Sequence, residues 1–284
     1  MFDKVFYQEK ENDKVRCQVC PHLCLLANDA EGICRARKNV NGRMAVQSYG
    51  QMTVLNLDPI EKKPLYHFKP GSMVLSFGSF GCNFSCDFCQ NWHIAIAKPA
   101  VKYISPGQLA DFAEKEKSRG NIGVAFTYNE PLINFEFVKD TSILLQERGM
   151  DSIIVSNGYI NEKPLLELAP LLSAANIDIK SFNEDFYRKI CGGSLEPAKN
   201  TVKILLQYCH VEITVLIIPG LNDSISEMNS LAKWLAGFDK NTVLHINRYF
   251  PCYKMDIPPT DKAILIDLQK EAQRFLQYVY IGNV

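Results

Sequence analysis

The sequence lacks a net charge, a long apolar run and an apolar amino-terminal segment. Its 284 residues carry 31 Lys plus Arg against 31 Asp plus Glu, so the formal net charge is zero. This balance gives no reason to expect a nucleic-acid partner or an anionic membrane surface. No apolar run reaches the roughly 18 residues of a membrane span, and the start, MFDKVFYQEKENDKVRC, has no secretory core. We therefore expect a cytoplasmic protein that binds neither nucleic acid nor membrane.

Cysteine, by contrast, is abundant. The chain has ten cysteines, and seven of them precede residue 90. Thiols stay reduced in the cytoplasm, so clustered cysteines favour metal binding or redox chemistry over disulfides.

The chain changes character near residue 72. Before this point it is rich in turn residues, which predict small hairpins and loops. After it, short apolar runs alternate with helical patterns, which favours a parallel sheet or barrel. The sequence therefore predicts an α/β protein with a Cys-rich accessory segment, 1–72, and a partial (β/α)6 TIM-like barrel, 73–284.

The boundaries of these elements follow from the apolar patterns and from helix-capping residues. Ser105 before Pro106 predicts one helix start, and Ser224 with Glu227 predicts another with a capping box. The expected strands are 73–79, 122–127, 152–156, 175–180, 211–217 and 243–248, and the expected helices are 106–119, 131–148, 162–172, 197–208, 224–237 and 260–277.

The first expected strand leads into GSFGCNFSCDFCQNW, with the spacing Cys82-x3-Cys86-x2-Cys89. Thiolates are the usual ligands of iron–sulfur clusters, and three of them leave one iron of a cubane open to a cofactor or substrate. The alternative is a zinc site, for which His93 is available as a fourth ligand.

This motif, with Phe88 as the aromatic residue before the last cysteine, resembles the signature of the radical S-adenosylmethionine (SAM) superfamily. The resemblance implies a [4Fe–4S] cluster on Cys82, Cys86 and Cys89, with SAM bound to the open iron. It also implies reductive cleavage of SAM to a 5′-deoxyadenosyl radical that abstracts hydrogen. A reductant such as flavodoxin or ferredoxin is then expected as a partner.

Polar residues at the ends of the second and third strands are candidate SAM contacts. Asn129 and Glu130 stand where the family has Gly-Gly-Glu-Pro, although this chain lacks both glycines. Ser156 and Asn157 begin a Ser-Asn-Gly that resembles the Thr-Asn-Gly of glycyl-radical-enzyme activases. The alternatives are a helix first turn at Glu130 and an ordinary strand-to-helix turn at Asn157.

Later strands supply further candidates because strand side chains alternate in direction. Asp178 and Lys180 are expected to point into the barrel, where they pair with each other or bind SAM and a cation. His245 and Asn247 point inward by the same alternation. The resemblance places a ribose contact here, and either His245 or Arg248 fits it, while a buried structural histidine is the alternative.

The amino-terminal cysteines Cys17, Cys20, Cys24 and Cys34 form a four-thiolate set. Four ligands within a short segment suggest a closed structural site for zinc or a second iron–sulfur cluster. The alternative is four free thiols.

A closer resemblance extends along nearly the whole chain. The strings Asp58–Phe68, Pro70–Ser72 and Cys89–Trp92 look like those of AmmeMemoRadiSam system radical SAM enzymes, which are similar to pyruvate formate-lyase activating enzymes. The resemblance implies hydrogen abstraction from a protein or peptide. The alternatives are radical modification of another peptide or small molecule, and a two-centre ferredoxin-like electron carrier.

Overall fold

The computed structural model of the chain describes residues 7–284. Residues 1–6 lie outside the described part, and the expectation that the chain has no secretory leader falls partly on them.

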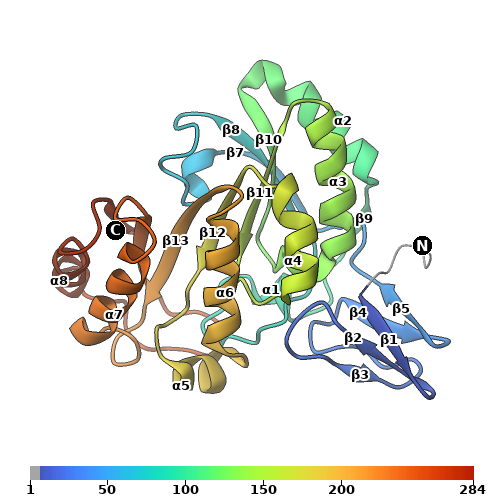
Figure 1. Ribbon diagram of the computed structural model, residues 1–284, viewed down its shortest axis with the longest axis horizontal. Helices are drawn as coiled ribbons and strands as arrows, with labels where there is room; N and C mark the ends of the chain where they lie inside the picture. Colours follow the sequence, from blue (N-terminus) through green and yellow to red (C-terminus); the bar gives the residue numbers. More distant parts are fainter. Residues whose placement is uncertain (1–6) are drawn as a thin grey trace.

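One eight-stranded sheet organises the molecule, in the order β15-β14-β13-β12-β11-β10-β8-β7 (Figure 1). Seven of its strands are parallel, and β7 (Val54–Pro59) joins antiparallel to β8 at one edge. Because β7 and β15 do not pair, the sheet stays open rather than closing into a full barrel. The expected partial TIM-like barrel is confirmed.

All six expected strands are present. They are β8 (Met73–Gly78), β10 (Asn121–Phe126), β11 (Asp151–Ser156), β12 (Ala174–Asp178), β13 (His210–Ile217) and β14 (Val243–Arg248). Sequence patterns missed the two edge strands, β7 and β15 (Val279–Gly282). Most of their residues are only partly buried, so neither shows the apolar run of an internal strand.

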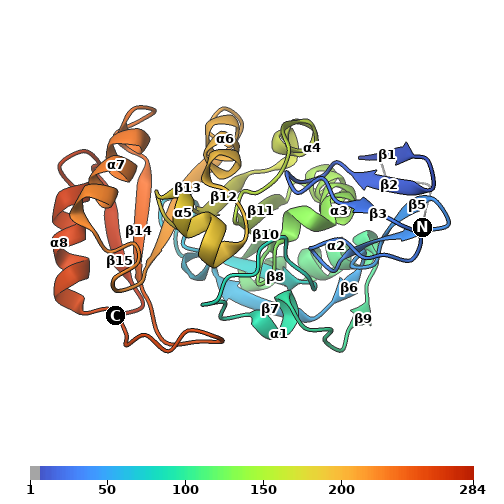
Figure 2. The ribbon, with the colours of Figure 1, turned by 90° about the horizontal axis from the view of Figure 1, so that it is seen from below.

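The expected helices follow the strands along the outer face of the sheet (Figures 1 and 2). They are α2 (Pro106–Lys115) with η2 (Glu116–Arg119), η3 (Pro131–Asn134) with α3 (Phe135–Glu147), α4 (Glu162–Leu168) with η4 (Ala169–Leu171), α6 (Leu195–Leu205), α7 (Ile225–Ala236) and α8 (Lys262–Ala272). Short elements not expected are η1 (Ile60–Lys62), α1 (Trp92–Ala95), α5 (Glu184–Phe186) and η5 (Tyr187–Cys191).

The two predicted helix caps differ in outcome. Ser105 forms a full capping box with Gln108. Ser224 accepts a hydrogen bond from the Glu227 backbone, but the Glu227 side chain does not return it. That carboxylate instead accepts from Ser181 and from the Phe182 backbone, so it anchors the loop after β12 rather than the start of α7.

Before the sheet, the chain forms small hairpins at the end of the molecule opposite α7 and α8 (Figures 1 and 2). These strands are β1 (Gln8–Glu11), β2 (Lys14–Cys17), β3 (Leu25–Leu26), β4 (Arg37–Val40) and β5 (Arg43–Val46), and β6 (Gln51–Met52) pairs with β9 (Lys102–Tyr103). Val15, Val19 and Leu26 belong to the same hydrophobic core as the barrel. The hairpins are therefore packed on the barrel rather than tethered to it. No helix among residues 7–284 is long and apolar enough to cross a bilayer.

Candidate functional site

The cluster loop, residues 79–91, follows β8 and carries Cys82, Cys86 and Cys89. Gly81 has a φ of +87°, and a Cβ at this position would lie 2.5 Å from the Cys34 carbonyl oxygen. Only glycine fits both constraints. The loop is thus shaped by its contact with the amino-terminal segment.

The three cysteines of the motif line one cleft, together with Phe88. Burial raises the pKa of the Cys82 and Cys89 thiols, and the neighbouring Cys191 thiol together with burial raises that of Cys86. Buried thiolates therefore need a metal centre to stabilise their charge. Three converging soft ligands beside a large open cleft fit a [4Fe–4S] cluster with one accessible iron.

Hydrogen bonds of two asparagines fix the conformation of the cluster loop. Asn83 donates to the Tyr159 carbonyl at 2.7 Å, and Asn157 donates to Asn83 Oδ1 at 2.9 Å. The Asn157 amide also lies 3.8 Å from Cys82 Sγ. Asn157 is thus placed to orient the loop and to donate a hydrogen bond to a ligand sulfur.

Two cysteines without a motif also reach the loop. The backbone amide of Ser85 donates to the Cys191 carbonyl at 2.9 Å, and the Cys252 thiol lies 3.6 Å from the Cys89 carbonyl. The spacing of Cys191 and Cys252 in the sequence carries no signal, and only the fold brings them to the cluster loop.

Tyr128 adopts a backbone conformation that is typical of glycine, at a place where the family has glycines and this chain has none. It adopts a φ of +71°, the left-handed conformation that glycine takes most easily. Its hydroxyl donates to Asp58 at 2.9 Å, and its carbonyl accepts from Asn91 at 2.7 Å. A Cβ on Gly78 would lie 3.0 Å from the Tyr128 ring, so Gly78 makes room for it.

The Glu130 carboxylate is buried, and both of its oxygen atoms accept hydrogen bonds from other groups of the protein. It accepts hydrogen bonds from the Leu132 amide, the Ser156 hydroxyl and the Asn157 amide, all at 2.8 to 2.9 Å. Burial outweighs these bonds and raises its pKa to about 7. Glu130 thus ties the ends of β10 and β11 together, and Asn129 likewise bonds the backbone of Ser79 and Gly81.

Asp178 and Lys180 both line the cleft, as their alternation predicts. Lys180 Nζ lies 2.9 Å from Asp178 Oδ2. Burial alone would lower the Lys180 pKa, but the charges of Asp178 and of the Cys86 thiolate raise it above its ordinary value. The ammonium group therefore stays charged at the cleft wall, where an anionic group can bind it.

The strand β14 places its polar residues differently. His245 Nε2 lies 2.6 Å from the buried Glu212, and Arg248 Nε donates to the Thr260 carbonyl at 2.7 Å. Neither residue lines the cleft, whereas Asn247 does. The ribose contact remains a prediction, and Asn247 is the polar residue of β14 that lines the cleft.

The floor of the cleft comes from the distinctive segment Asp58–Phe68. Lys63 is buried and bonded to Asp58 at 3.0 Å, and the Pro64 carbonyl accepts from Asn176 at 2.8 Å. Among residues 7–284, Asn176 Oδ1 and Thr214 Oγ1 are buried without a hydrogen-bond partner. Both residues line the cleft, so these polar atoms are available to a bound molecule.

The cleft has a volume of about 340 Å³ and is open to solvent. It brings together every candidate contact except His245 and Arg248. Its lining includes Cys82, Cys86, Phe88, Cys89, Asn129, Glu130, Ser156, Asn157, Asp178 and Lys180, together with Lys62, Lys63, Asn91, Asn176, Thr214 and Asn247.

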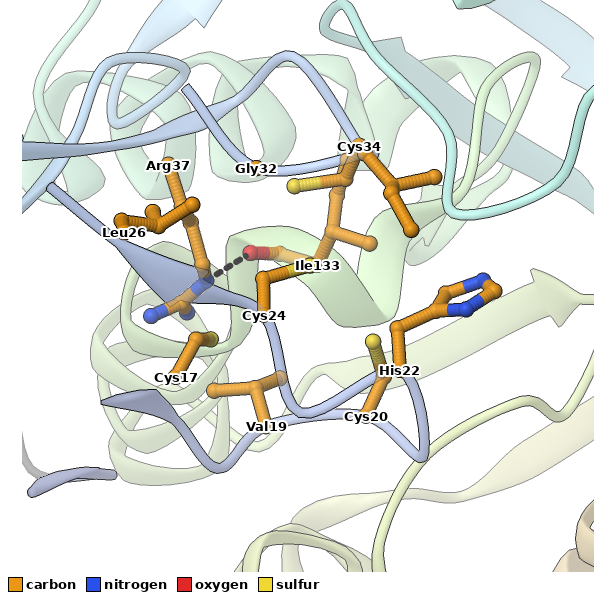
Figure 3. A pocket seen from close by; sticks show the side chains of 11 residues that line it. Cys17, Val19, Cys20, His22, Cys24, Leu26, Gly32, Cys34, Arg37 and Ile133 are labelled. Carbon is orange, nitrogen blue, oxygen red and sulfur yellow. Dashed lines mark hydrogen bonds between the residues drawn. The ribbon is translucent and has the colours of Figure 1, made fainter. Parts of the chain in front are cut away.

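A second site lies in the amino-terminal segment, where Cys17, Cys20, Cys24 and Cys34 line one pocket (Figure 3). We call these residues the four-cysteine site. All four thiols are free. Within residues 7–284, no three His, Cys, Asp or Glu side chains are arranged to hold a single metal ion.

Comparisons with known proteins match these observations. Residues 77–235 match the family model described as the Radical SAM superfamily. The chain is 38% identical over its full length to an uncharacterised protein of Methanocaldococcus jannaschii, covering 86% of that protein. It is 28% identical over 73% of its length to a pyruvate formate-lyase-activating enzyme of Clostridium pasteurianum, covering 93% of that enzyme.

Among solved structures, Streptococcus suis SuiB bound to S-adenosylmethionine superposes with a TM-score of 0.57 at 14% identity. The match covers 71% of this chain and 47% of that one. A radical SAM methyltransferase from Sphaerobacter thermophilus gives a TM-score of 0.56 at 15% identity, with 75% and 67% covered. At these identities the likeness concerns the fold.

Proposed function

Because the chain belongs to the radical SAM superfamily of enzymes, we propose that it abstracts a hydrogen atom from a protein or peptide substrate, as glycyl-radical-enzyme activases do. The observation that carries the proposal is the convergence of three thiols and the Asp178–Lys180 pair on one open cleft. The alternative of an electron carrier is dropped, since the family is enzymatic.

The residues of the cleft divide into two groups. Cys82, Cys86 and Cys89 would hold the [4Fe–4S] cluster, and Lys180 would bind the SAM carboxylate. When bound, the cluster and SAM supply a reactive 5′-deoxyadenosyl radical. Glu130 and Asn157 position the surrounding loops rather than entering the chemistry, because their polar atoms are bonded within the protein.

A polypeptide substrate is supported by the open edge of the sheet and by the similarity to activating enzymes. The closed floor supports a second candidate, a small molecule. Lys63, Asn176 and Thr214 present polar groups deep in the cleft, which suits a small polar molecule or the side chain of a peptide.

Deuterium transfer separates these two candidates. Reconstituted protein is incubated anaerobically with SAM, dithionite and an extract of its own host grown in D₂O, divided into macromolecular and small-molecule fractions. The proposal predicts deuterated 5′-deoxyadenosine with the macromolecular fraction only. Deuterium transfer with the small-molecule fraction alone would refute the protein substrate and support the second candidate.

The proposal includes a metal centre at the four-cysteine site, either zinc or an iron–sulfur cluster. Four thiols facing one pocket in a small segment are the usual ligand set for both. Such a centre would stabilise a segment whose hairpins are too small to fold alone.

A further inference from the structure

The floor of the cleft contains two buried polar side chains with an unpaired atom each. Asn176 on β12 has no exposed surface, and Thr214 on β13 is 4% exposed. Both residues line the cleft, yet within residues 7–284 neither Asn176 Oδ1 nor Thr214 Oγ1 has a hydrogen-bond partner. Leaving a buried polar atom unpaired costs stability, so two such atoms in one cleft wall indicate a binding site.

A hydrogen bond determines which atom of the Asn176 amide stays unpaired. Its Nδ2 donates to the Pro64 carbonyl at 2.8 Å. The opposite orientation would place two oxygen atoms against each other, so Oδ1 is the unpaired atom. The neighbour of Asn176 in register on β13 is Glu212, whose carboxylate is itself an acceptor and is bonded to other groups. Asn176 therefore offers an acceptor, for which a ligand has to supply a donor.

Thr214 supplies the complementary group on the same wall. It pairs in register with Asp178, and Asn176 lies two residues before Asp178 on the same face of β12. Asn176 and Thr214 are therefore diagonal neighbours on adjacent strands. The Thr214 hydroxyl can donate to a carbonyl oxygen while Asn176 Oδ1 accepts from an N–H. This pair matches a ligand that offers an N–H and a C=O along one edge.

The charged groups of the cleft floor are already paired with one another. The buried Lys63 lies 3.0 Å from Asp58, and Lys180 lies 2.9 Å from Asp178. Lys62 also reaches Asp58, but its side chain is 66% exposed and so lies in solvent. The atoms left unpaired are a neutral amide oxygen and a neutral hydroxyl. They suit a neutral ligand group, because a charged group would lack a counter-ion there.

The pair lies deeper in the barrel than the place proposed for SAM. The cluster loop and Lys180 both follow the carboxyl ends of their strands. Asn176 precedes Lys180 by four residues, which is roughly 13 Å along an extended strand. A molecule bound to Asn176 and Thr214 would thus lie below SAM, where a substrate can approach it from the floor.

We propose that Asn176 and Thr214 form a substrate subsite for a neutral amide that offers its N–H and C=O on the same side, as a primary carboxamide does. Asn176 Oδ1 accepts from the N–H, and the Thr214 hydroxyl donates to the carbonyl oxygen. Such a group occurs in the glutamine or asparagine side chains of a polypeptide and in small amides. The inference rests on the proposed function, because it takes the cleft as the place of hydrogen abstraction.

The first test measures the binding of small probes to reconstituted wild-type protein with an oxidised cluster. Saturation-transfer NMR compares propionamide with three molecules of similar size: N-methylacetamide, methyl acetate and propionate. Propionamide should bind about tenfold more tightly than each of them, because only propionamide is neutral and offers both groups on one side. Equal binding of the four probes, or tighter binding of propionate, would overturn the inference.

Addition of SAM to the same samples distinguishes substrate from cofactor. The propionamide signal should persist when SAM is bound. Its loss on addition of SAM would assign Asn176 and Thr214 to the cofactor and overturn the inference.

The second test uses a T214V variant, in which a methyl group replaces the hydroxyl. Because Thr214 Oγ1 is unpaired, the free energy of unfolding should not fall, whereas propionamide should bind about fivefold to tenfold more weakly. T242V is the matched control, since Thr242 Oγ1 is also buried and unpaired but lies just before β14, outside the cleft lining. Equal propionamide binding by the two variants, or a clear loss of stability in T214V, would contradict the inference.

These tests are separate from the test of the radical chemistry, because binding needs no reduced cluster. Normal SAM cleavage without propionamide binding would overturn the inference alone. Propionamide binding without SAM cleavage would count against the proposed function alone. If both hold, the deuterium experiment described above identifies the source of the amide: transfer from the macromolecular fraction indicates a carboxamide side chain, and transfer from the other fraction indicates a small amide.

Discussion

Among the side chains of the cleft, Lys180 has the environment best suited to bind an anionic ligand. Its ammonium group is held in the cleft wall by Asp178, next to the sulfur of Cys86, and these charges raise its pKa. One salt bridge leaves two N–H donors of the ammonium group available for a carboxylate. Glu130 is the opposite case, because its two oxygens are already bonded within the protein.

A K180Q variant tests this reading. It should weaken SAM binding by about tenfold or more, as expected when a charge-assisted hydrogen bond of 1.5–3 kcal/mol is lost, while the cluster iron stays unchanged. Equilibrium binding of SAM and iron analysis measure the two effects separately. K270Q, at an exposed lysine of α8, is the matched control. Loss of iron in K180Q would assign the lysine to cluster assembly instead.

The sequence predicts the position of some cleft residues but not of others. The cysteines of the cluster loop, Asp178 and Lys180 reach the cleft because motif spacing and strand alternation determine their position. Asn176 and Thr214 carry no motif, and only the fold brings them into the cleft, whereas Lys63 belongs to the distinctive string Asp58–Phe68. His245 follows the alternation rule, yet its ring bonds Glu212 inside the protein.

At the scale of elements, the segment Asp58–Phe68 owes its position to two buried carboxylates. Asp58 pairs with Lys63, and Glu212 on β13 accepts hydrogen bonds from the backbone amides of Tyr66 and His67. Glu212 also accepts from His245. The distinctive sequence of this segment thus has a structural reason: it closes the floor of the barrel through bonds to the sheet.

Glu212 gives a pH-dependent prediction. Burial would raise its pKa, but hydrogen bonds from two histidines and two backbone amides lower it from 4.5 to about 2. Because the folded-state pKa is lowered, its contribution to stability is present above pH 4.5 and is lost as the pH falls toward 2.

An E212Q variant should therefore lower the free energy of unfolding near neutral pH by about 2–3 kcal/mol. Urea unfolding at several pH values measures the difference from the wild type, which should shrink below pH 4.5. E162Q, at an exposed position in the first turn of α4, serves as the control. A difference that stays constant down to pH 2 would disprove the assigned role of the ionised carboxylate.

Elements with strong periodic patterns follow the sequence closely, as the six inner strands and their helices do. The edge strands β7 and β15 do not, because a strand that is buried on fewer sides needs fewer apolar residues. The short elements α5 and η5 could not be predicted from the sequence for another reason. They are shaped by contacts with the cluster loop, such as that between the Cys191 carbonyl and the Ser85 amide, which are distant in sequence.

For the whole molecule, the two cysteine sites are neighbours in space, although Cys34 and Gly81 are 47 positions apart in the sequence. The hairpins that carry the four-cysteine site share one hydrophobic core with the barrel. Composition and spacing predict each site separately, but not their contact, because it depends on the docking of one segment on the other.

The central claim is that the cluster loop supports reductive cleavage of SAM. The most direct measurement is anaerobic incubation of reconstituted protein with SAM and dithionite, followed by assay of 5′-deoxyadenosine. We predict its formation by the wild type and its absence in a C82A/C86A/C89A variant. Formation by this variant, or none by wild-type protein with an intact cluster and bound SAM, would contradict the account.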